Sequence, residues 1–204
     1  MDPSAVAIVR AGTHRIPRSL RDLPVLDPAA GDAGAADLTG YRRLIVLGTE
    51  RDLARVLTRL LRADRLDVEV AHVRRPWQAR RARTAAAVRV PLIRDETGTV
   101  IAGAAHWAPP DGQRTVHGEL VVDDVQLFDG DVPGVRIEPI AVMPGLRARV
   151  QAGRLRRSRW VSGRAVQLGT TGAIVVRDGV ATARPARRST FYRHTEGWLR
   201  VAGK

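Results

Sequence analysis

The chain has 204 residues, a formal net charge of +13 at pH 7 and no cysteine. Its length allows one sizeable domain or two small ones, and the lack of cysteine excludes disulfides, thiol nucleophiles and thiolate metal sites. The charge favours anionic partners, either nucleic acid or an anionic membrane surface. Lys204 is the single lysine, so arginine carries the basicity, a composition that a GC-rich genome also produces through its codons.

The first forty residues indicate one strand and a long loop. Residues 5–10 are apolar and are expected to form the strand, and residues 27–40 are rich in small residues, as surface loops are. No apolar run reaches the roughly 20 residues that cross a bilayer. The N-terminus carries neither a basic leader nor a long apolar segment, so we expect a cytoplasmic protein.

A strand–helix–strand unit follows. Arg43–Leu47 is a short apolar run typical of a buried strand. After Gly48-Thr49, apolar residues recur at helical spacing from about Glu50 to Ala63, and Val68–Val73 supplies the next strand. This unit predicts a small parallel sheet. The Arg-rich segment Gln78–Ala87 predicts a basic surface helix.

From Val90 onward the pattern changes to short β-rich segments separated by Gly, Pro or Asp turns. The expected strands are Val90–Arg94, Thr99–Trp107, Gly118–Val122, Val125–Phe128, Val135–Glu138, Ala148–Val150, Arg164–Gln167 and Ala173–Arg177. Many short strands favour an antiparallel sandwich. We therefore expect an α+β protein, with a small Rossmann-like α/β part at residues 1–90 and a β-sandwich-like domain at residues 91–204.

Two segments of the second half carry motifs. Residues 134–150 indicate strand, tight turn and strand, with Pro-Ile-Ala-Val-Met-Pro-Gly-Leu at 139–146. Residues 172–180 indicate a strand that ends in Asp-Gly-Val. In order and spacing these segments resemble the C-terminal domain of the diacylglycerol kinase and related lipid kinase family, which is NAD kinase-like. That domain has Pro-x-Ala, then Asp-Gly-x-Leu, and later Asp-Gly-Glu.

The resemblance implies an ATP site whose phosphate loop has lost most of its motif residues. The family's Gly-Gly-Asp-Gly-Thr loop is matched here by Gly48, Thr49 and Asp52, with one glycine left. Glu50 brings a carboxylate to the place that the phosphate oxygens would take. The family's second Gly-rich loop is replaced by Val-Arg-Arg-Pro-Trp at 73–77, where the proline removes a main-chain donor.

The resemblance also implies that the catalytic base is lost. In the family, the Asp of Asp-Gly-x-Leu accepts the proton of the lipid hydroxyl that attacks the γ-phosphate. Pro144 stands at this position and cannot accept a proton. Asp178 of the later motif survives and is the remaining catalytic candidate. Asp123 and Asp124 could bind a divalent cation, although such a pair is also typical of solvent-facing turns.

Clusters of arginine offer a different kind of site, for anions. The candidate anion-binding residues are Arg74, Arg75, Arg154, Arg156, Arg157 and Arg159. They could hold phospholipid headgroups or nucleic-acid phosphates, with Trp160 at the interface or stacked on a base. A solvated basic loop explains the same pattern.

We expect a truncated, catalytically degenerate lipid-kinase-like protein, cytoplasmic and bacterial, that binds an anionic lipid or another phosphate compound, at the inner membrane face in the lipid case. The first alternative is an active, divergent lipid kinase with ATP and Mg²⁺ as cofactors, using Asp178, Asp123 or Asp124. The second is a basic RNA- or DNA-binding protein that uses residues 74–83 and 147–164 without base-specific readout. A homodimer is compatible with all three.

Overall fold

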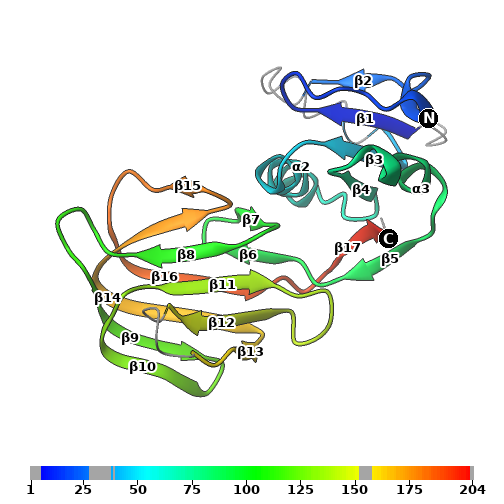
Figure 1. Ribbon diagram of the computed structural model, residues 1–204. Helices are drawn as coiled ribbons and strands as arrows, with labels where there is room; N and C mark the ends of the chain where they lie inside the picture. The colour runs from blue at the N-terminus through cyan, green and yellow to red at the C-terminus, as the bar shows by residue number, and fades with distance from the viewer. Residues whose placement is uncertain (1–5, 28–37, 39, 152–157, 203–204) are drawn as a thin grey trace. The chain divides into compact units, whose positions relative to one another are not determined.

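The computed structural model describes residues 6–27, 38, 40–151 and 158–202 (Figure 1). The fold is mixed α/β, with mostly strands and few helices. The chain divides into two compact units, Met1–Val90 with Glu196–Lys204, and Pro91–Thr195. The expectation that residues 91–204 form one domain is therefore wrong at its C-terminal end. The last strand pairs within the first unit, and a short apolar segment does not reveal its partner in the sequence.

The described part of the first unit forms a six-stranded sheet in the order β2-β1-β3-β4-β17-β5. Its strands are β1 (Val6–Arg10), β2 (Val25–Leu26), β3 (Arg43–Leu47), β4 (Glu69–Val73), β5 (Ala87–Val90) and β17 (Trp198–Val201). Neighbouring strands from β2 to β17 are parallel, and β5 is antiparallel to β17 at the edge. The parallel sheet expected from the strand–helix–strand unit is present.

Helices bury apolar residues against this sheet. The amphipathic α2 (Glu50–Arg62) contacts β3 and buries Leu53, Val56, Leu57 and Leu60. The 3₁₀ helix η1 (Arg18–Leu20) contacts the short α3 (Ala79–Thr84), which follows a second 3₁₀ turn, η2 (Pro76–Gln78). Leu20, Ala79 and Ala82 share one apolar cluster with Ile8, Ile45 and Val73 of the sheet. The expected helix at Gln78–Ala87 is shorter, because the chain turns extended at Ala85 and enters β5.

The strand order fixes where a ligand site would lie in the first unit. The chain leaves β1 toward β2 on one side, and it leaves β3 toward β4 on the other side. Such a reversal between neighbouring parallel strands leaves a crevice at their carboxyl ends, where α/β proteins bind ligands. Here the carboxyl ends of β1 and β3 are neighbours, with Arg10 paired to Leu47.

The second unit is an antiparallel sheet of eleven strands among the described residues, with β13-β12-β11-β8-β14-β16-β6-β7 as its main path. The strands are β6 (Ile93–Asp95), β7 (Val100–Ile101), β8 (Ala105–Ala108), β9 (Val116–Val122), β10 (Val125–Val132), β11 (Val135–Pro139), β12 (Leu146–Val150), β13 (Val161–Gly163), β14 (Ala165–Arg177), β15 (Val180–Ala181) and β16 (Ala186–Arg193).

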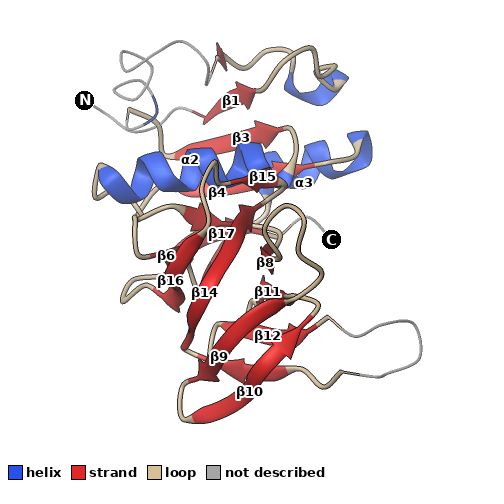
Figure 2. Cartoon of the chain, turned by 90° about the vertical axis from the view of Figure 1, so that its left-hand side faces the viewer, coloured by secondary structure: helices blue, strands red, loops and turns tan. Residues whose placement is uncertain are grey.

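The long strand β14 joins the two halves of this sheet (Figure 2). Its first half pairs with β9 and β16, and its second half pairs with β8 and β15. The strands expected separately at 164–167 and 173–177 are thus one element, with a register shift between Gly169 and Ala173. Trp107 and Phe191 meet in the core with ring centroids 5.5 Å apart.

The finer fold predictions, a Rossmann-like first unit and a β-sandwich second unit, stay predictions. Among the described residues, no helix is both long and apolar enough to cross a membrane.

Candidate phosphate site and the positions of the predicted site residues

Side chains of the loop after β3 bond to groups of the same loop and to the segment after β4. The Asp52 carboxylate accepts hydrogen bonds from the Thr49 main-chain N–H at 2.9 Å and from the Thr49 hydroxyl at 2.7 Å. It lies so close to Gly48 that a Cβ at that position would be 2.7 Å from Asp52 Oδ2. Glu50 pairs with Arg74 across a 2.7 Å contact.

This arrangement changes what the N-terminus of α2 can bind. A helix N-terminus favours anions because its first N–H groups point outward and its dipole is positive there. In this chain the first turn already contains two carboxylates, Glu50 and Asp52. A phosphate at the same place would meet negative charge. The structure brings Gly48, Thr49 and Asp52 together, in a helix cap.

The loop after β4 is also held from within. The N–H groups of Arg74 and Arg75 both donate to the Gln78 side-chain oxygen, at 2.9 and 3.0 Å. The Arg75 guanidinium lies 5.0 Å from the centre of the Trp77 ring, and that ring is 69% exposed. The main-chain donors that a Gly-rich loop would offer to phosphate are therefore used locally.

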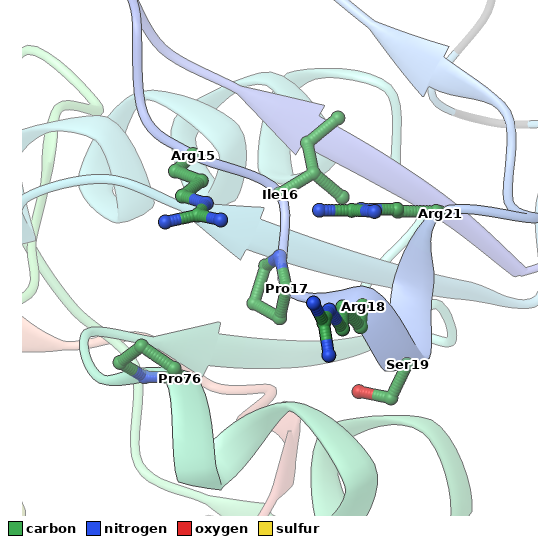
Figure 3. A pocket seen from close by; sticks show the side chains of 7 residues that line it. All are labelled: Arg15, Ile16, Pro17, Arg18, Ser19, Arg21 and Pro76. Carbon is green, nitrogen blue, oxygen red and sulfur yellow. The ribbon is translucent and has the colours of Figure 1, made fainter.

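A basic pocket includes Pro76 of the loop after β4. It has a volume of about 460 Å³ and its lining consists of Arg15, Ile16, Pro17, Arg18, Ser19, Arg21 and Pro76. Figure 3 shows the three guanidinium groups around Pro17, with Pro76 contributed by the segment after β4. The pocket residues come from the segments that follow β1 and β4, beyond the carboxyl ends of parallel strands.

The sequence interpretation missed this pocket. Arg15, Arg18 and Arg21 are spaced three residues apart, but this spacing alone does not predict the pocket. The 3₁₀ turn η1 begins at Arg18 and Arg21 caps it, whereas Arg15 lies before the extended Pro17. The grouping therefore depends on the path of the chain after β1.

Asp178 lies at the turn after β14 with a left-handed backbone, φ 45°. Its carboxylate accepts main-chain hydrogen bonds from Ala102 at 2.9 Å, Gly103 at 2.7 Å and Ala104 at 3.0 Å. Both oxygens thus hold the β7–β8 connection. The catalytic role proposed for Asp178 stays a prediction. In this geometry the carboxylate stabilises the connection between β7 and β8.

Asp123 and Asp124 occupy the turn between β9 and β10. The Asp123 carboxylate accepts hydrogen bonds from the N–H groups of Arg164 at 3.0 Å and Ala165 at 2.9 Å, which fastens the turn to β14. Asp124 lines a shallow hollow of about 450 Å³ with Arg164 and Gln167. Within the described part of the chain, no group of three or more His, Cys, Asp or Glu side chains could hold a metal ion. The metal role stays a prediction.

The turn between β11 and β12 carries Pro144. Ile140 N–H bonds the Gly145 carbonyl at 2.8 Å, and Arg193 donates to the Pro144 carbonyl at 3.1 Å. At the tip, the side chains of Val142 and Met143 are each 67% exposed. Residues 140–145 contain no carboxylate, so the turn supplies no general base.

The predicted basic stretch is described only in part. Arg154, Arg156 and Arg157 lie outside the described residues, and Arg159 is exposed. The guanidinium carbons of Arg147 and Arg149 lie 4.3 and 4.5 Å from the centre of the Trp160 ring. Cation–π contacts of this kind use a face of the ring, so the arginines compete with a nucleic-acid base for stacking on Trp160.

Comparisons with known proteins concern the fold. A scan of protein-family models and a search of curated proteins found no match. An NAD kinase from Archaeoglobus fulgidus, in complex with ATP, superposes with a TM-score of 0.66 at 12% identity, over 98% of this chain and 94% of that one. A diacylglycerol kinase from Bacillus anthracis str. Sterne superposes with a TM-score of 0.65 at 10% identity, over 98% and 97%.

The chain therefore has the fold of NAD kinases and diacylglycerol kinases. The resemblance expected from residues 134–150 and 172–180 is confirmed at the level of the fold.

Proposed function

We propose that this chain is a catalytically degenerate member of the kinase fold, which binds a phosphate-bearing ligand and transfers no phosphoryl group. The loop after β3 carries the proposal. Asp52 takes the donors of Thr49, and Glu50 is paired with Arg74. A nucleotide phosphate would meet two carboxylates there, where a phosphate loop offers bare main-chain N–H groups.

The remaining carboxylates support the same proposal. Asp178 and Asp123 each hold main-chain N–H groups of neighbouring segments. Protonating or reorienting Asp178 would weaken its bonds to three partly buried N–H groups, which is unfavourable. This weighs against the active divergent kinase. Strand order further supports the interpretation of the first unit as Rossmann-like. The apolar core shared by residues of both halves of the second sheet supports the interpretation of the second unit as a β-sandwich.

The ligand we propose is an anionic lipid or another phosphate compound, held by arginine side chains. Arginine binds phosphate through paired N–H donors in a fixed plane, so it can replace a Gly-rich loop for binding although not for catalysis. The net charge of +13 attracts such ligands. The Trp160 ring, already in contact with two arginines, disfavours a nucleic-acid base as the partner.

Calorimetric titration with ATP, with and without Mg²⁺ at physiological salt, tests this proposal, with an active diacylglycerol kinase as the positive control. We expect no binding that requires Mg²⁺, because the loops after β3 and β4 use their donors locally. Heat that is equal with and without Mg²⁺ and falls with added salt would agree with binding by arginines. Saturable binding that depends on Mg²⁺ would contradict the proposal and favour the active kinase.

A further inference from the structure

The three arginines of the basic pocket have no counterion among the described residues. Arg15, Arg18 and Arg21 take part in no ion pair there, and no carboxylate lines the pocket. Asp22 is adjacent in sequence, but its carboxylate pairs with Arg83 at 2.8 Å. Arg83 holds the pKa of Asp22 below its ordinary value, so this acid stays ionised and engaged elsewhere. Three like charges at one pocket repel one another unless an anion joins them.

The main chain that carries these arginines is held firmly in place. Leu20 is fully buried, and its N–H bonds the Pro17 carbonyl at 3.0 Å. Arg83 donates to the Ser19 carbonyl at 3.3 Å, which ties η1 to α3. The segment then returns to the sheet, where Ile8 N–H bonds the Pro24 carbonyl at 2.8 Å. The arginines are therefore presented from an ordered support, which reduces the conformational entropy lost when a ligand binds.

The pocket also has the size and the mixed lining of a ligand site. Its volume of about 460 Å³ lies within the roughly 300–1,000 Å³ of small-molecule sites. Ile16, Pro17 and Pro76 supply apolar surface, and Ser19 adds a hydroxyl. A ligand there would thus meet both guanidinium groups and apolar carbon.

We propose that this pocket binds a small molecule with two or more phosphate groups, through Arg15, Arg18 and Arg21. The inference rests on the proposed function and names the site that carries it. Two phosphate groups match three guanidinium groups in charge, and each guanidinium can donate two parallel hydrogen bonds to phosphate oxygens. The apolar lining residues Ile16, Pro17 and Pro76 would contact the organic part of the ligand.

Inorganic pyrophosphate is the probe, titrated calorimetrically into the full chain. The test variant carries Arg15→Gln, Arg18→Gln and Arg21→Gln. The matched control carries Arg51→Gln, Arg62→Gln and Arg80→Gln, which changes the net charge equally at exposed positions of the same unit. We expect the pocket variant to bind pyrophosphate about a hundredfold more weakly and the control within about threefold of the unchanged chain. Circular dichroism and thermal melting establish that both variants are folded.

A single Arg18→Lys variant adds a test of geometry. It keeps the charge but loses the paired donors, so we expect affinity to fall about tenfold. Equal losses in the pocket variant and the control would overturn the assignment, because binding would then follow net charge alone. Binding of phosphatidylglycerol vesicles without any binding of pyrophosphate would also overturn it and would indicate a membrane surface. Either result would overturn only the pocket assignment. The proposed function is tested separately, by the Mg²⁺ dependence of ATP binding.

Discussion

The Asp52 carboxylate accepts two hydrogen bonds from Thr49, one from its main-chain N–H and one from its hydroxyl. The pair begins α2 and at the same time fills the loop that follows β3. One side chain therefore caps the helix and uses the Thr49 donors of the loop after β3. In the proposed function, this second role is the reason why the loop binds no phosphate.

Replacing Asp52 with alanine tests the structural half of this role. The change removes the acceptor at the start of α2, and loss of such a cap costs about 1–2 kcal/mol of the free energy of unfolding. Urea unfolding measures it. Asp67→Ala is the control, because Asp67 forms an exposed pair with Arg65 and such pairs contribute about 0–1 kcal/mol. Equal losses in both variants would mean that Asp52 does not cap the helix.

Asp178 allows a graded test. Asp178→Ala removes the acceptor for three main-chain N–H groups, and we expect a loss of about 2–4 kcal/mol in the free energy of unfolding. Asp178→Asn keeps one acceptor oxygen and tolerates the positive φ, so it should lose less. Asp129→Ala, at an exposed strand position, should change stability by less than about 0.5 kcal/mol. A stable Asp178→Ala protein would contradict the structural role.

Two adjacent arginines offer a matched comparison at one carboxylate. Arg43 is buried, bonds Glu69 at 2.6 Å, and donates to the carbonyls of Ala82, Arg83 and Ala85 at the end of α3. Arg42 bonds the same Glu69 at 3.2 Å with its side chain 53% exposed.

We expect Arg43→Ala to lower the free energy of unfolding by about 3 kcal/mol, since it removes a buried guanidinium and takes the donor away from three carbonyls, while Glu69 keeps Arg42. Arg42→Ala should lose about 0–1 kcal/mol. Chemical denaturation of both variants decides this, and a larger loss for Arg42→Ala would contradict the burial argument.

His106 predicts how stability depends on pH. Its Nε2 lies 3.1 Å from Arg136 Nη1 and its Nδ1 lies 2.9 Å from Gln151 Nε2, so both ring nitrogens face donor nitrogens, which disfavours the doubly protonated ring. Burial lowers the pKa of His106 below its ordinary value of 6.5, and the charge of Arg136 lowers it further. Between the lowered pKa and 6.5, the unfolded chain binds a proton that the folded chain excludes.

The free energy of unfolding should therefore be unaffected by His106 above about pH 6.5 and should fall as the pH drops below that value. The measurement is urea unfolding as a function of pH for the unchanged chain and for His106→Gln, which cannot bind the proton. The variant's stability should fall less steeply on acidification. Parallel curves for the two proteins would show that His106 does not titrate in this range.

Local patterns predict much of the first unit. The apolar run Arg43–Leu47 forms β3, and the helix expected from Glu50 to Ala63 is α2, which ends at Arg62. These elements are predictable because their apolar residues follow the period of the structure that they form. The place of β17 between β4 and β5 is not predictable, because strand pairing across more than a hundred residues leaves no local signal.

One predicted strand spans the boundary between the two units. The segment expected as one strand at Val90–Arg94 is split at Pro91, with β5 in one unit and β6 in the other. From the sequence, the candidate site could be predicted only as a place where a family motif is missing. Glu50 and Pro144 are visible in the sequence as departures from a motif. The grouping of Arg15, Arg18 and Arg21 depends on the path of the chain after β1 and on Pro76, far along the chain.

The most direct test of the central claim is phosphoryl transfer itself. The full chain would be incubated with γ-labelled ATP and Mg²⁺ in the presence of a lipid extract, diacylglycerol or NAD, beside an active diacylglycerol kinase. We predict no label in any product, because the loop after β3 is filled by Asp52 and the turn at Pro144 supplies no base. Label in a lipid or nucleotide product, lost in a folded Asp178→Ala protein, would contradict the account and establish an active kinase.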